Sequence, residues 1–157
     1  MAVAGCARDD RAALHERLDQ WFEVERSLYF KSKARCTVAM FQVDNAAPRE
    51  GFAVASNPAL AKAQFRGGRQ AAVQMNAYSP HDLTETLLLS GDGVFGKEVL
   101  AAAAQAGPCF KGTEAERALL KAMTRRGAIL AYDRDTEGMV VLDPDVMVVF
   151  YVAGDVW

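Results

Sequence analysis

The chain has 157 residues, of which 51% are hydrophobic and 24% charged, and its 18 basic and 20 acidic residues give a net charge of −2. Such a hydrophobic, nearly neutral composition excludes a disordered chain and predicts no nucleic-acid partner. The longest apolar run, Val146 to Ala153, is far shorter than the roughly 18 residues that a membrane-spanning helix needs. We expect a flexible N-terminal segment over residues 1–8 and a single folded domain over residues 9–157.

A long N-terminal helix is predicted to begin after Asp9 and Asp10, because carboxylates favour the positive end of the helix dipole. The basic segment 31–35 is expected to close this helix at its other end. Apolar side chains recur between these limits at helical spacing and form one face, which we interpret as core. They are Leu14, Leu18, Trp21, Phe22, Leu28 and Tyr29.

Residues 36–43 are apolar at nearly every position and rich in strand-forming residues, which predicts a strand covered on both faces. A central helical group follows. Its helices are expected near residues 58–65, 80–89, 95–106 and 113–126, with a weak strand signal at 69–77 between the first two. Ser79 is predicted to cap the second helix, with Pro80 in its first turn.

The C-terminal part changes from a helical to a strand period. Three short β-rich runs over residues 128–152 are separated by polar turns at 133–137 and 143–145, which predicts a three-stranded antiparallel meander. Together with the strand at 36–43, this meander gives an antiparallel sheet of four or more strands. The predicted fold class is therefore α+β, with the long N-terminal helix and the central helical group packed on the sheet.

The stretch Val3-Ala4-Gly5-Cys6 resembles the lipobox of bacterial lipoproteins, an aliphatic residue, a small residue, Gly and then Cys. The resemblance implies that Cys6 is acylated, that the chain is cut before it, and that the lipid holds the protein on a membrane. Only five uncharged residues precede Cys6, whereas a signal peptide has a charged region and an apolar region of about 7–15 residues. Either the signal lies upstream of this sequence, or the match is accidental and Cys6 is a free thiol.

If Cys6 is an anchor, Cys36 and Cys109 remain, and an even remainder in an exported protein predicts a disulfide between them. The alternative is two buried free thiols, since cysteine behaves as a small apolar residue in cores. The spacing of the three cysteines matches neither a zinc site nor a thioredoxin-like redox motif.

Three patterns that could carry chemistry are weak. Residues 91–96 match G-x-G-x-x-G, but a helix is predicted before them where a dinucleotide site needs a strand. Residues 133–138 resemble the opening of a calcium-binding loop, yet Pro144 stands at the position that needs Glu, so a hairpin turn is predicted. His81 with Cys109 could form a thiol hydrolase, although nothing in their spacing supports it.

We expect an accessory or structural protein of the bacterial cell envelope. It would be periplasmic, anchored to the membrane through Cys6, and active by binding a protein partner through the long helix or a sheet edge. The sequence indicates no catalytic, cofactor-binding or metal-binding residue, no cofactor and no identifiable small-molecule ligand. The alternative is a cytoplasmic enzyme or small-ligand-binding domain with reduced cysteines and a pocket between sheet and helices.

Overall fold

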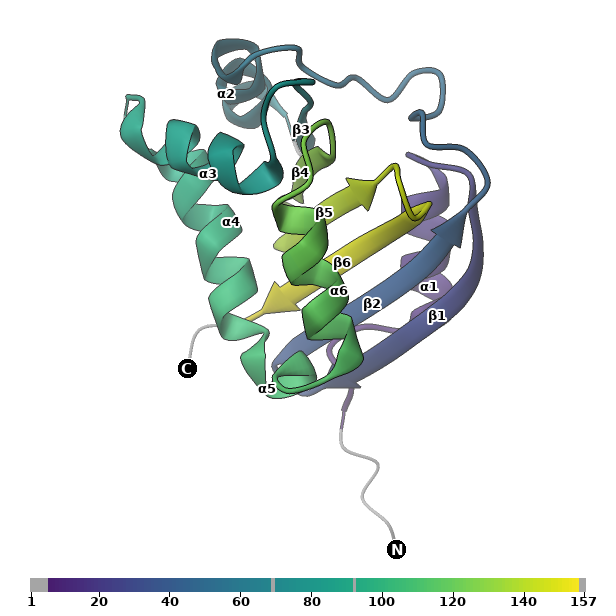
Figure 1. Ribbon diagram of the computed structural model, residues 1–157. Helices are drawn as coiled ribbons and strands as arrows, with labels where there is room; N and C mark the ends of the chain where they lie inside the picture. The colour runs from purple at the N-terminus through teal and green to yellow at the C-terminus, as the bar shows by residue number, and fades with distance from the viewer. Residues whose placement is uncertain (1–5, 69, 92, 156–157) are drawn as a thin grey trace, which may run out of the picture.

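A computed structural model describes residues 6–68, 70–91 and 93–155. Within these residues one antiparallel sheet of six strands runs in the order β1-β2-β6-β5-β4-β3 (Figure 1). The strands are β1 (Val24–Lys33), β2 (Cys36–Val43), β3 (Gln70–Val73), β4 (Ile129–Asp133), β5 (Gly138–Asp143) and β6 (Val148–Gly154). The helices are α1 (Arg11–Asp19), α2 (Pro58–Gly67), α3 (Pro80–Leu89), α4 (Val94–Gln105), α5 (Gly107–Phe110) and α6 (Glu114–Met123). The predicted α+β class is confirmed.

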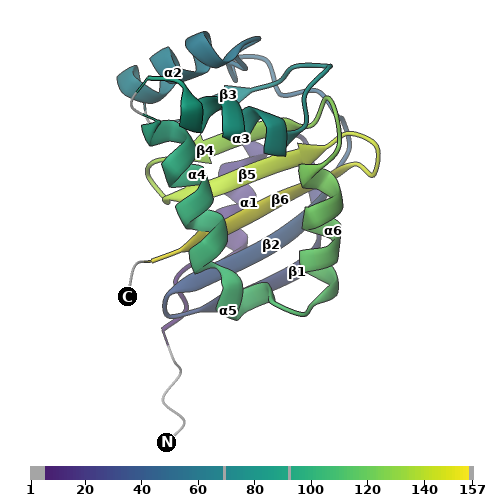
Figure 2. The same ribbon diagram turned by 60° about the vertical axis from the view of Figure 1, so that its left-hand side comes forward.

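The sheet lies between two helical layers of unequal size. Helices α2 to α6 cover one face, and α1 lies behind the other (Figures 1 and 2). Each face has its own apolar core: Phe150 and Val152 point towards the larger layer, whereas Val149 and Tyr151 point towards α1. The continuous apolar runs of β2 and β6 follow from this arrangement, because a strand covered on both faces needs apolar side chains at every position.

The predicted C-terminal meander is confirmed, and its two turns are built alike. Each turn joins its strands through four residues, from Asp133 to Gly138 and from Asp143 to Val148. In each, the first aspartate accepts a hydrogen bond from the backbone N–H two residues on, at 3.1 Å and 3.0 Å, an Asx turn. The residue before the second strand has positive φ, 54° at Glu137 and 57° at Met147. The segment that resembled a calcium-binding loop is therefore a hairpin turn.

Each turn also binds an arginine from one of the helical layers. Arg17 of α1 contacts the buried Asp133, with 2.8 Å from its Nη2 to Oδ1. On the other side of the sheet, Arg125 lies 3.0 Å from the buried Asp143 and 2.8 Å from Asp145. A buried carboxylate is costly unless it is paired, so these arginines fix both helical layers to the meander.

The predicted long N-terminal helix is wrong. Helix α1 ends at Asp19, and residues 24–33 form the edge strand β1, which pairs with β2. The pairing of β1 shifts register twice, between Val24 and Ser27 and again between Ser27 and Tyr29. Such bulges interrupt the two-residue alternation that marks a strand. The apolar residues of this segment are therefore spaced in the sequence as they would be on one face of a helix. Trp21 and Phe22 are nevertheless buried as predicted, whereas Leu28, also predicted in the core, is 43% exposed on the edge strand.

The predicted central helices are confirmed, with small shifts at their ends. Ser79 caps α3: its side chain accepts from the Asp82 backbone N–H at 3.2 Å, while Asp82 accepts from the Ser79 N–H at 2.9 Å. The hydrogen bond from the Ser79 backbone N–H to the Asp82 carboxylate is the largest cause of a lowered Asp82 pKa, and the Ser79 side chain lowers it further. The weak strand signal at 69–77 corresponds to β3, and the four-residue helix α5 was not anticipated.

Candidate functional site

The two cysteines predicted to pair do so, because Cys36 and Cys109 form a disulfide with Cα atoms 5.9 Å apart. Both residues are buried, and the bond joins the start of β2 to α5. Neighbouring contacts hold the same junction: the Tyr29 hydroxyl donates to the Cys109 carbonyl at 3.2 Å, and Lys33 Nζ donates to the Pro108 carbonyl at 3.1 Å. A structural disulfide is typical of an oxidising compartment.

The disulfide also removes the proposed thiol nucleophile, since the Cys109 sulfur is bonded to Cys36. His81 lies instead on an exposed face of α3, 3.4 Å from Glu85, and His15 contacts the Glu25 carbonyl beside β1. In the part of the chain that the structure describes, no group of three His, Cys, Asp or Glu side chains is placed to hold a metal ion.

The glycine-rich motif at 91–96 is a connection between α3 and α4. Asp92, within it, lies outside the described residues. Gly93 has φ 69° and precedes α4 without a side-chain cap. Gly96 lets α4 approach α3, because a Cβ there would lie 2.8 Å from the Leu88 nitrogen. With a helix on each side, the motif lacks the strand that a dinucleotide site requires.

Cys6 is an exposed, free cysteine at the first described position, and residues 3–5 of the lipobox resemblance lie outside the described residues. Two residues later, at Arg8, the chain is hydrogen-bonded to the rest of the domain. The backbone N–H of Arg8 donates to the Lys33 carbonyl at 2.8 Å, and its guanidinium binds Asp155 and the Thr136 carbonyl at 2.8 Å and 2.6 Å. An anchor at Cys6 would therefore be separated from the folded body by a single residue, Ala7.

A groove of about 370 Å³ lies between α6, the C-terminal half of β2 and the start of β6. Its floor is apolar: Met40 and Phe150 are cross-strand partners on the face below the helices. Val148 lies beside them, and Val146 in the β5–β6 turn forms one wall with 53% of its surface exposed. Phe150 and Val148 are buried, Met40 is partly exposed and Val146 is exposed, so the groove offers a small apolar surface with charged residues around it.

The other wall of the groove is one stripe of α6. Glu114, Arg117, Ala118 and Lys121, with Arg125 beyond the helix end, line the groove at intervals of three and four residues, which places them on one side of a helix. Residues Ala115, Leu119 and Ala122 form the neighbouring buried stripe. The sequence shows this spacing, but nothing in the sequence indicates that this stripe of the helix lies beside β2 and β6.

Among the described residues, Arg125 is paired with carboxylates, unlike the other two cations of this wall, Arg117 and Lys121. The carboxylates of Asp143 and Asp145 lie within 3.0 Å of the Arg125 guanidinium. The charge of Asp143 and its hydrogen bond to Arg125 raise the Arg125 pKa. Arg117 and Lys121 are exposed and form no ion pair with any described carboxylate. They remain available to a negatively charged group in the groove.

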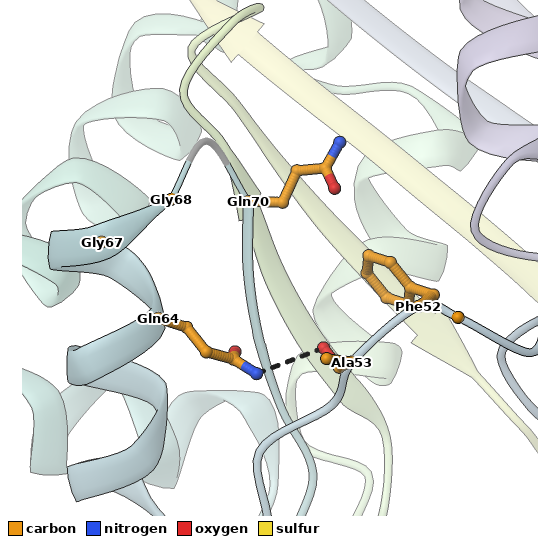
Figure 3. A pocket seen from close by; sticks show the side chains of 7 residues that line it. Phe52, Ala53, Gln64, Gly67, Gly68 and Gln70 are labelled. Carbon is orange, nitrogen blue, oxygen red and sulfur yellow. Dashed lines mark hydrogen bonds between the residues drawn. The ribbon is translucent and has the colours of Figure 1, made fainter.

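A second hollow, of about 310 Å³, lies at the edge of the sheet that β3 forms (Figure 3). There Ala55 pairs with Val73 in a short parallel bridge. One step further along, the Gln64 side chain lies between the two segments. It donates to the Ala53 carbonyl at 3.4 Å (Figure 3), and it accepts from the Ala72 N–H at 3.2 Å. The amide group of Gln64 thus replaces a direct backbone hydrogen bond, and it protects an edge strand from pairing with another chain.

None of the helices within the described ranges has the length and apolar character needed to cross a membrane. The sequence matches no protein-family model, and the comparisons with curated proteins and with solved structures found no match.

Proposed function

We propose that this protein is an accessory protein of the bacterial cell envelope that binds a protein partner and is tethered to a membrane by a lipid on Cys6. The buried Cys36–Cys109 disulfide is the observation that carries the proposal. Disulfides persist in the periplasm and outside the cell, whereas thiol reductants keep cytosolic cysteines reduced.

Two further features support this role. Cys6 is exposed and lies directly before the attachment of the chain at Arg8, so an acyl group there would not disturb either core. The groove beside α6 supplies an apolar surface with charged walls, which suits recognition of another protein.

The native protein tests the proposal through its mass. Cells expressing the full gene are quenched in acid, the protein is redissolved at neutral pH in denaturant with an alkylating reagent, because only the thiolate reacts, and it is analysed intact and after digestion. We expect a chain that begins at an acylated Cys6, with Cys36 and Cys109 joined in one cross-linked peptide. An unprocessed terminus together with alkylated Cys36 and Cys109 would refute the envelope role and favour a cytoplasmic protein.

A further inference from the structure

We propose that the groove beside α6 binds a short amphipathic helix of a partner protein, which inserts apolar side chains and presents a carboxylate to Arg117 and Lys121. This inference deepens the proposed partner-binding function and rests on it.

The size of the groove sets the number of anchoring side chains. A cavity of about 150 Å³ accommodates one benzene ring, so the volume of about 370 Å³ fits roughly two large apolar side chains. In the protein they would contact Met40 and Ala118, which are partly buried, and Val146, which is exposed. Two apolar residues three or four positions apart on one helix would reach this floor together.

The backbone around the groove favours a helix over an extended peptide. Strand β2 pairs on both sides, with β1 and β6, and β6 pairs on both sides, with β2 and β5. A peptide in the groove therefore finds side chains but no sheet edge with free backbone groups. A helix satisfies its own backbone hydrogen bonds and offers an apolar stripe, the arrangement seen in helix-in-groove recognition.

The charge of the groove favours an acidic partner. Arg117 and Lys121 lie one helical turn apart on α6 and are exposed, while the charge of Arg125 is already balanced by Asp143 and Asp145. The residues that line the groove include three cations, Arg117, Lys121 and Arg125, and two carboxylates, Glu114 and Asp143, so the lining carries a net charge of +1, and its cations that pair with no described carboxylate are those of α6. A carboxylate held between Arg117 and Lys121 would increase both the rate of association and the selectivity of binding.

A fatty acid also combines an apolar body with a carboxylate, but the groove suits it less well. Val146 is 53% exposed, and Met40 and Ala118 are partly exposed as well, so an acyl chain in the groove would keep much of its surface in water. A helix buries only one stripe and keeps its other sides solvated.

The test uses the oxidised full chain and a phage-displayed library of random 16-residue peptides. We expect enriched peptides to carry two apolar residues three or four positions apart and Asp or Glu on the adjacent flank. The consensus peptide, labelled for fluorescence polarisation, should gain helical circular dichroism on binding. Charge reversal in the variant Arg117→Glu/Lys121→Glu should weaken its binding at least tenfold, and Val146→Asp should do the same through the apolar wall.

The matched control is Lys111→Glu/Arg126→Glu, which makes the same change in net charge at two exposed positions outside the groove. Its affinity should stay within about twofold of the unmodified protein. Failure to enrich such peptides, enrichment of basic peptides, or equal weakening by both double variants would overturn the inference. Decanoate that binds in the groove and displaces the peptide would also overturn the inference, because it would indicate a lipid site. Because these assays use purified protein, their outcome is independent of the Cys6 acylation test.

Discussion

Removal of the Cys36–Cys109 disulfide should lower the free energy of unfolding by about 4 kcal/mol. The bond closes a loop with a sequence separation of 73 residues, and the chain-entropy relation for a loop of that length gives about 15 cal/mol/K, or about 4.4 kcal/mol at 25 °C. For a chain of this size each kcal/mol corresponds to roughly 2–4 °C in Tm. We therefore expect Tm to fall by about 8–16 °C.

Urea denaturation followed by circular dichroism measures this loss in a Cys6→Ser background, which removes the free thiol. The single variants Cys36→Ala and Cys109→Ala each break the cross-link, so each should lose most of the 4 kcal/mol, and the double variant should add little. The m-value should rise in all three, because the unfolded chain becomes more expanded. Losses below about 1 kcal/mol, or two single losses that add up in the double variant, would refute the entropic reasoning.

Three other predictions concern contacts away from the disulfide. Arg17→Met should lower the free energy of unfolding, measured by urea denaturation, by up to about 3 kcal/mol, since it leaves the buried Asp133 without its cation. Asp133→Asn added to the same chain should restore part of that loss. An Arg17→Met variant with unchanged stability would contradict the prediction. Gln64→Ala should cost about 1 kcal/mol and accelerate hydrogen exchange at the Ala72 amide, so unchanged exchange would disprove the bridging role. Burial is the main cause, and the charge of Asp9 the next, that raises the pKa of Tyr151 from 10.0 to about 12. The contribution of Tyr151 to the free energy of unfolding should therefore be fully present below pH 10. It should decline between pH 10 and 12, because the unfolded chain releases the proton first. Tyr151→Phe should decline less over that range, with tyrosinate absorbance at 295 nm as the monitor; an equal decline would count against this assignment.

The strands with continuous apolar runs could be predicted from the sequence because their pattern reflects burial on both faces. Residues 36–43 and 146–153 contain few polar side chains, and each turn between the C-terminal strands opens on an Asp that forms an Asx turn. The disulfide followed from counting cysteines under the assumption of export, so its physical basis in the sequence was weaker than that of the strands.

Strand β1 could not be predicted, because its signals are individually misleading. It is an edge strand with exposed charged residues, its two bulges shift the alternation, and the hairpin to β2 turns through Ala34 and Arg35 without Gly or Asn. The groove was missed for a different reason. Its floor comes from β2 and β6 and its wall from α6, and only the sheet order, which sequence spacing does not specify, brings these segments together.

The pairing of Arg8 with Asp155 would determine how the molecule stands on a bilayer. A lipid on Cys6 would bring both Arg8 and Asp155 close to the headgroups, together with the tip of the β1–β2 hairpin, whose Arg35 carbonyl accepts from the Asp155 N–H at 2.8 Å. Strand β6 ends at this side of the molecule. Its first residue, Val148, lies seven residues before Asp155, a distance of roughly 23 Å at about 3.3 Å per residue. The α6 groove would then lie away from the lipid surface, where a partner in the aqueous phase can reach it.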